Sequence, residues 1–220
     1  MLRWRVKKVF ILSPANAAGE RAALIYNPRA QFDLARRLRQ SEGVPLAEVF
    51  SFLSGLYFRG KFTYARKFAN PPKRIPGVVV ITSNCGLVPA ETRVTVDQVR
   101  AFSGVPIDPR DSRYLGPLER DAALLGKVAG PRCRFVLLGS VGTKKYVEVL
   151  LSFFRERLLF PPAFVGRGDM SRGGLLLRCA AEDRELDYAP LAGAVRHGTR
   201  PPRLEPRRWG FSIFGGTTNT

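Results

Sequence analysis

The segment Cys133-Arg-Phe-Val-Leu-Leu138 leads into Gly139-Ser-Val-Gly-Thr-Lys-Lys-Tyr146 and then into the apolar stretch Val147–Phe154. A short continuous apolar run is typical of a strand buried on both faces, and we expect a helix after the loop. A strand, a glycine-rich loop and a helix N-terminus together can bind an anion, because backbone N–H groups and the helix dipole converge there. The Gly-x-x-x-x-Gly-Lys-Ser/Thr spacing of a Walker A motif is absent.

Two other continuous apolar runs precede this unit, Val9-Phe-Ile-Leu12 and Val78-Val-Val-Ile81. Helices are expected between the runs, because Leu34 and Leu38 repeat at helical spacing and the stretch from Val49 to Leu53 is mostly apolar. Strands that alternate with helices predict an α/β protein. We expect a single compact domain with a mostly parallel central sheet and flanking helices.

Two hairpins and a tail complete the expected architecture. Residues 46–69 are predicted to form a helical hairpin around a turn at Ser54–Gly60, and Leu175–Ala180 is predicted to pair with Glu185–Tyr188 as a C-terminal β-hairpin. We assign residues 1–197 to one domain with the helical hairpin inserted. Residues 198–220 are rich in Pro, Arg and Gly, and we expect a poorly packed tail there.

Two local features are predicted before the third strand. Thr95 and Gln98 have the spacing of a capping box at the start of a helix. Residues 103–120 are expected to form a long loop in which Asp108 and Asp111 pair with neighbouring arginines. The intervening proline and the flanking arginines favour a turn with ion pairs over a metal cage.

The charge of the chain is strongly unbalanced. Its 220 residues include 36 Lys and Arg against 18 Asp and Glu, which gives a formal net charge of +18. A balance this basic usually indicates a polyanionic partner, most often a nucleic acid, and we expect single- or double-stranded DNA. The alternative is an arginine-rich proteome in which the charge has no such role.

Cysteine and histidine are too sparse for a metal centre. Cys85, Cys133 and Cys179 are widely spaced, and His197 is the single histidine of the sequence. We therefore expect reduced core cysteines, no metal and no cofactor. No apolar run approaches the roughly 20 residues of a membrane span, so we expect a cytoplasmic protein, monomeric and without a membrane partner.

The segment Phe164-Val-Gly-Arg-Gly-Asp-Met-Ser-Arg-Gly-Gly174 concentrates glycines and charged groups. Glycines let a backbone approach a ligand closely, and Arg167, Ser171 and Arg172 can contact a phosphate. Asp169 is the only acid of the segment, so it is either a partner of the arginines or the working group of a site. The alternative is a structural loop whose aspartate and arginines cap each other.

The helical hairpin carries a cluster of cations: Arg59, Lys61, Arg66 and Lys67. Two helices joined by a glycine-bearing turn loosely resemble a helix-hairpin-helix, which presents backbone N–H groups to a DNA phosphate. Lys144 and Lys145 are further phosphate-binding candidates, because they lie in the glycine-rich loop after the third strand. Many helical hairpins contain a glycine without binding DNA, and that alternative stays open.

Five segments follow one another in an order that resembles the YaaA-like proteins, a bacterial family linked to peroxide stress and DNA protection. The segments are Phe10–Asn16, Leu56–Gly60, Val80–Pro89, Leu138–Tyr146 and Gly166–Arg172. They are similar to that family's Ser-Pro-Ala-Lys, Asp-Val-Tyr-x-Gly, Ile-Leu-Ser-Gly-Leu-Tyr-Gly-Leu-Leu-x-Pro, Ala-Ser-x-Glu-Tyr and Ala-Arg-Gly-x-Met-Ala-Arg. The resemblance implies a compact α/β domain with a DNA-binding helical hairpin. Asn16 replaces the family's lysine, Gly55 stands near its acid and Cys85 replaces a tyrosine.

The first functional hypothesis is a DNA-binding enzyme that excises a base, a glycosylase acting in repair or defence. Such enzymes need a pocket for an extruded base, a stacking aromatic ring and a carboxylate or positioned water. The candidates for stacking are Tyr57, Phe58 and Tyr146; for reading a base edge, Asn16 and Asn84; and for catalysis, Asp169 and Glu20.

Two other functions remain open. A non-catalytic DNA-binding stress protein needs only the charge and the hairpin, and a nucleotide or nucleoside transferase would use the glycine-rich loops for a phosphate. A Ser-His-Asp hydrolase is disfavoured, because His197 lies next to the tail and no Gly-x-Ser-x-Gly elbow occurs. That histidine is either a cover over the site or a solvated side chain.

Overall fold

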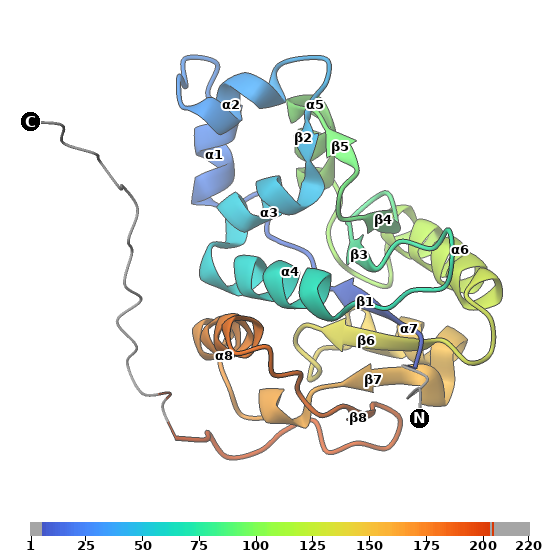
Figure 1. The fold of residues 1–220 in the computed structure, drawn as a ribbon. Coiled ribbons are helices and arrows are strands. Elements are labelled where there is room, and N and C mark those ends of the chain that lie inside the picture. The colour runs from blue at the N-terminus through green and yellow to red at the C-terminus, as the bar shows by residue number, and fades with distance from the viewer. Residues whose placement is uncertain (1–5, 203, 205–220) are drawn as a thin grey trace, which may run out of the picture.

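The computed structural model describes residues 6–202 and 204. These residues form a six-stranded sheet of order β4-β3-β1-β6-β7-β8 (Figure 1). The strands are β1 (Lys8–Leu12), β3 (Val78–Ile81), β4 (Leu87–Pro89), β6 (Arg134–Leu138), β7 (Leu158–Phe160) and β8 (Ala189–Pro190). The four central strands are parallel, and β4 and β8 pair antiparallel at the two edges. The predicted α/β class and mostly parallel sheet are confirmed.

Helices cover both faces of the sheet. The helices are α1 (Glu20–Tyr26), α2 (Asp33–Leu38), α3 (Leu46–Ser54), α4 (Leu56–Phe68), α5 (Val96–Ser103), α6 (Ser112–Val128), α7 (Val147–Phe154) and α8 (Asp169–Ala181). A separate two-stranded sheet joins β2 (Val44–Pro45) to β5 (Arg93–Val94). Two 3-10 turns, Arg155–Arg157 and Pro162–Phe164, flank β7.

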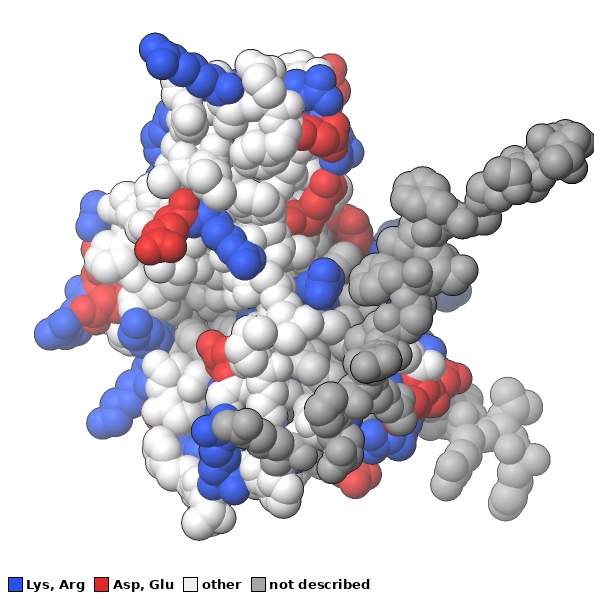
Figure 2. Space-filling view, turned by 90° about the vertical axis from the view of Figure 1, so that its left-hand side faces the viewer, with Lys and Arg blue, Asp and Glu red and all other residues white. Residues whose placement is uncertain are grey.

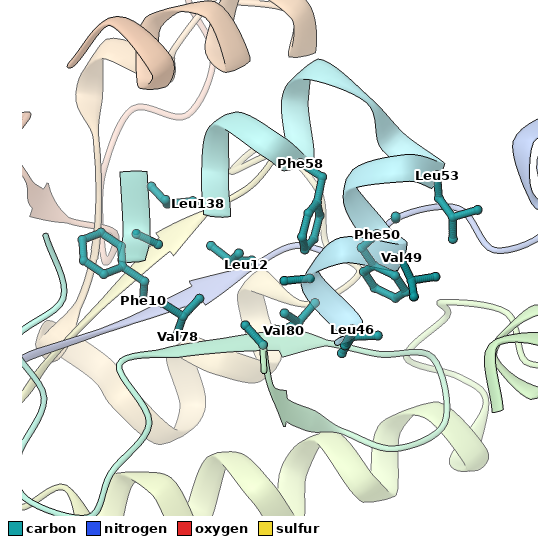
Figure 3. Packing of buried hydrophobic residues seen from close by; sticks show 14 of the residues in the cluster. Phe10, Leu12, Leu46, Val49, Phe50, Leu53, Phe58, Val78, Val80 and Leu138 are labelled. Carbon is teal, nitrogen blue, oxygen red and sulfur yellow. The ribbon is translucent and has the colours of Figure 1, made fainter. Parts of the chain in front are cut away.

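The period-two geometry of the central strands divides the core into two layers. Phe10 and Leu12 of β1 face α3, α4 and α8, whereas Val9 and Ile11 face α6 and α7. Figure 3 shows the first layer, in which side chains of α3 and α4 pack on those of β1, β3 and β6. The continuous apolar runs are thus explained by burial on both sides.

A close contact between α4 and α8 is made possible by two glycines. A Cβ on Gly60 would lie 2.6 Å from the carbonyl oxygen of Gly173, and a Cβ on Gly173 would lie 2.8 Å from Tyr57 Cα. Gly55 alone joins α3 to α4, with φ +60°. The turn predicted for Ser54–Gly60 is therefore wrong beyond residue 55, because Gly60 serves helix packing inside α4.

The C-terminal β-hairpin was predicted in the wrong place. Residues 175–180, predicted as a strand, belong to α8, whose face of Leu175, Leu176, Cys179 and Ala180 is buried. Three consecutive leucines fit either a buried strand or a buried helix, and the contact with α4 selects the helix. The antiparallel pair near the C-terminus is formed instead by β7 and β8.

The region before β6 is partly as predicted. The capping box of Thr95 and Gln98 is present, and Asp108 and Asp111 pair with Arg110 and Arg113. The predicted loop of residues 103–120 is too long, because α6 begins at residue 112. Most of the predicted tail lies outside the described residues. No helix among residues 6–202 and 204 is long and apolar enough to cross a membrane.

Candidate active site at the carboxyl edge of the sheet

A cleft of about 590 Å³ opens where β1 and β6 end. The chain leaves β1 toward helices on one face of the sheet and leaves β6 toward α7 on the other face. Loops that diverge in this way leave a crevice between neighbouring parallel strands, which is where open α/β sheets bind ligands. The cleft is thus a direct consequence of the strand order.

Five of the predicted site residues line this cleft: Asn16, Tyr57, Lys145, Tyr146 and Asp169. Glu20 and Asn84 are not among the lining residues. Glu20 is exposed at the start of α1, and the side-chain oxygen of Asn84 accepts from the Cys85 thiol. The structure therefore does not bring the two predicted catalytic carboxylates together in the cleft.

Asp169 is the one carboxylate among the described residues that line the cleft. It begins α8, and its side chain is 66% exposed. Its carboxylate is 3.4 Å from the Arg172 guanidinium, which also donates to the carbonyl oxygen of Phe164 and is 12% exposed. The aspartate is therefore open to a ligand. Arg172 is largely buried by its contacts with Phe164 and Asp169, and its predicted contact with a phosphate stays a prediction.

Lys61 was predicted to bind phosphate or DNA with the other cations of the helical hairpin, but it is buried. Its side chain lies behind the cleft, 1% exposed, and Nζ donates to the carbonyl oxygen and to Oγ of Ser13, each at 2.8 Å. Burial lowers the pKa of Lys61 to about 7, with Asp169 raising it and Arg172 lowering it further. The amine is thus poised to change charge near neutral pH.

The charge of Lys61 gives a testable dependence of stability on pH. Between about pH 7 and the ordinary lysine pKa, the unfolded chain keeps a proton that the folded protein has lost, so stability rises with pH there. The expected slope from this group is about 1.4 kcal/mol per pH unit. Urea unfolding at about pH 7 and pH 9 measures it.

The contribution of Lys61 is isolated by comparing the rise in stability with pH between two variants. Lys61→Met should lose this part of the rise, whereas Lys127→Met, which removes an exposed lysine of α6, should keep it. An equal rise in Lys61→Met and the native protein would show that Lys61 carries no depressed pKa. Both variants keep the buried tyrosines and cysteines, so the titration of these groups contributes equally to both and cancels in the comparison.

The three predicted stacking rings are not free to stack on a base. The ring of Tyr57 is 5% exposed and lies 4.5 Å from Nζ of Lys61, and Phe58 is fully buried in the core. Tyr146 is also 5% exposed, and its hydroxyl binds the backbone of Ser140. The aromatic rings therefore shape the cleft, and any contact with a ligand is through an edge or a hydroxyl.

The Tyr57 hydroxyl is buried without a partner. It makes no hydrogen bond with the described residues, although the Arg172 guanidinium is close enough to lower its pKa slightly. Burial raises the pKa of Tyr57 well above its usual value, so the hydroxyl stays protonated. A buried donor without a partner costs stability unless a ligand or water satisfies it.

The glycine-rich loop between β6 and α7 is only partly available for an anion. The N–H of Ser140 donates to the Tyr146 hydroxyl, and the N–H of Lys145 donates to Oγ1 of Thr143. Lys145 lines the cleft, and Lys144 is exposed. Phosphate binding there would therefore depend on the two lysines more than on the backbone. His197 is exposed and packs on Gly142 of this loop.

The remaining basic candidates are distributed over the surface. Arg59 and Arg66 are exposed on α4, whereas Lys67 pairs with Asp183. Arg167 donates to the Ser171 hydroxyl and to the backbone of Ala163. Figure 2 shows Lys and Arg in separate groups over one face, with acidic side chains between them. The positive charge is therefore spread over this face and does not form one stripe.

Ser13 was missed by sequence reasoning, although its position at the end of the first apolar run made it a candidate. It lines the cleft and is 7% exposed. Cys85 is exposed, contrary to the prediction of a core cysteine.

In comparisons with known proteins, no family model, curated protein or solved structure matches the chain.

Proposed function

We propose that the protein is a base-excising enzyme of the DNA glycosylase type, which cleaves the N-glycosidic bond of a base extruded into the cleft. One observation carries the proposal: an exposed carboxylate, Asp169, borders a cleft of about 590 Å³ on a protein of net charge +18. A protein that only binds the sugar-phosphate backbone of DNA needs no such cleft. The geometry therefore favours a base-excising enzyme over a non-catalytic DNA-binding protein.

The size and chemistry of the cleft suit a nucleoside. Small-molecule sites usually occupy about 300 to 1,000 Å³ and combine apolar walls with a few polar groups. Here the apolar lining residues include Phe50, Phe102 and Ile107, and the loops that follow β1 and β6 supply polar side chains such as Ser13, Asn16 and Ser140. A base in the cleft could pack its ring on the apolar residues and direct its polar edge to the hydroxyl and amide groups.

Asn16 and Tyr57 are the groups that could read this edge. The side-chain oxygen of Asn16 accepts from the N–H of Ala18, which leaves its amide N–H₂ as the donor toward a ligand. The unpartnered hydroxyl of Tyr57 is a second donor. Two fixed donors would favour a base edge that carries acceptor atoms.

Asp169 would act on the sugar. Departure of the base leaves positive charge on the sugar ring, and a nearby carboxylate stabilises that charge or activates the attacking water. Because α8 is held against α4 at Gly173 and Gly60, the carboxylate is attached to a fixed element.

The resemblance to the YaaA-like proteins supports the same site. Each of the five resembling segments supplies at least one residue of the cleft, through Ser13, Tyr57, Ser83, Tyr146 and Asp169 among others. Segments that lie far apart in the chain converge on one edge of the sheet. This convergence is expected if the resemblance reflects a shared site rather than a shared core.

Salt dependence tests the class of substrate. Neutralisation of about four phosphates by surface cations should weaken binding of a single- or double-stranded oligonucleotide about 100-fold between roughly 50 and 200 mM salt. A mononucleotide should show a much smaller slope. Oligonucleotide binding with no salt dependence, or tighter binding of the mononucleotide, would exclude DNA as the substrate and favour a nucleotide transferase.

A further inference from the structure

A buried pair at the floor of the cleft has no part in the base-release scheme. Ser13 Oγ and Lys61 Nζ are 2.8 Å apart, and a second contact to the Ser13 carbonyl oxygen fixes the amine in place. Ser13 borders the cleft, and Lys61 lies behind it. A hydroxyl placed between a buried amine and an open cleft is the arrangement of serine nucleophiles that use a lysine base.

We propose that Ser13 is a nucleophile activated by Lys61, and that the cleft supports a second activity, acyl transfer from a small ester or amide. The carbonyl oxygen of the substrate would lie at the Tyr57 hydroxyl. The acyl group would contact apolar residues that line the cleft, such as Phe50 or Ile107. This activity is independent of base excision and does not require DNA.

The reaction balances without a further reagent. Ser13 Oγ forms a bond to the carbonyl carbon while its proton moves to the neutral Lys61 amine. The bond from that carbon to the leaving oxygen or nitrogen then breaks, and the Lys61 ammonium returns the proton to the leaving group. Water repeats the two steps on the acyl-serine and releases a carboxylic acid.

The surroundings of Lys61 support its role as a base. Its pKa of about 7 leaves much of the amine neutral near pH 7, and a neutral amine can accept the hydroxyl proton. The charged groups that act on it are Asp169 and Arg172 of α8, and the ring of Tyr57 lies 4.5 Å from Nζ. An exposed lysine would be almost fully protonated at this pH.

Tyr57 supplies the stabilising donor. Its hydroxyl stays protonated and is buried without a hydrogen-bond partner among the described residues, on a side chain that lines the cleft. A donor already in place needs no reorganisation when negative charge develops on the carbonyl oxygen, which is the property that makes such donors effective.

The test uses an alkyl fluorophosphonate, which a serine nucleophile attacks at phosphorus with release of fluoride. The full chain is incubated with this probe, and adducts are located by peptide mass spectrometry. We expect an adduct on Ser13 and none on the exposed Ser152 of α7. Lys61→Met should slow the modification by about 100-fold or more, whereas Lys127→Met should leave it unchanged.

A native, folded protein without an adduct on Ser13 would overturn the proposal, and so would an equal rate in folded Lys61→Met. If Lys61→Met does not fold, the pH dependence of the native protein decides. The rate should rise with pH and level off above about 7, in line with the Lys61 pKa. A rate on Ser13 without this profile would also contradict the role of Lys61.

Discussion

Replacing Gly173 by alanine should lower the free energy of unfolding by about 2 kcal/mol and the melting temperature by roughly 4 to 8 °C. The added methyl group would lie 2.8 Å from the carbonyl oxygen of Leu56 and from Tyr57 Cα, both backbone atoms of α4. Backbone in a helix cannot yield as a side-chain end can, so α4 and α8 would have to move apart. This cost exceeds the gain of about 1 kcal/mol that alanine brings over glycine in a helix.

Gly174→Ala is the matched control, because it makes the same change one residue later in the same helix. Its methyl group would meet only the end of the Leu204 side chain, at 3.7 Å. This variant should keep or gain stability by up to about 1 kcal/mol. Equal melting temperatures for the two variants would show that the helices do not approach as closely as described.

Asp169→Asn should slow base release by about 100-fold or more while leaving DNA binding and melting temperature nearly unchanged. The amide has almost the same shape but lacks the negative charge that would stabilise the sugar cation. Because Asp169 is exposed and makes one weak ion pair at 3.4 Å, its replacement should disturb the fold little.

Glu20→Gln is the matched control for charge. It removes a carboxylate from the first turn of α1 at a position outside the cleft. We expect base release by this variant to equal that of the native protein. A large loss in Glu20→Gln with none in Asp169→Asn would place the reaction elsewhere and remove the basis for the proposed site.

The class of fold was predictable because its signals are local. The runs of residues 9–12, 78–81 and 135–138 place apolar side chains on both faces of the sheet, which requires covering layers on both sides. The capping box at Thr95 is likewise local. The leucines of residues 175–177 led to the wrong prediction of a strand. Their local pattern fits a helix or a strand, and the contact with α4 decides for the helix.

The candidate site was predictable in part for a related reason. Loops that follow parallel strands meet at one edge, so Asn16 and Tyr146 could be placed near each other from sequence. The depth of a side chain depends on which helix covers it. Lys61 looked like one more cation of a basic cluster, yet the α4 and α8 contact buries it against Ser13. The position of Glu20 outside the cleft likewise depends on tertiary packing and not on the local sequence.

Base excision at the cleft can be measured by incubating the native protein with duplex and single-stranded DNAs that carry modified and damaged bases. Free base is measured by mass spectrometry, and abasic sites are measured by alkali cleavage. We expect free base and abasic sites in equal amounts from at least one substrate, with both lost in Asp169→Asn. Salt-sensitive binding of the DNAs without release of any base would contradict it and leave a DNA-binding protein without this activity.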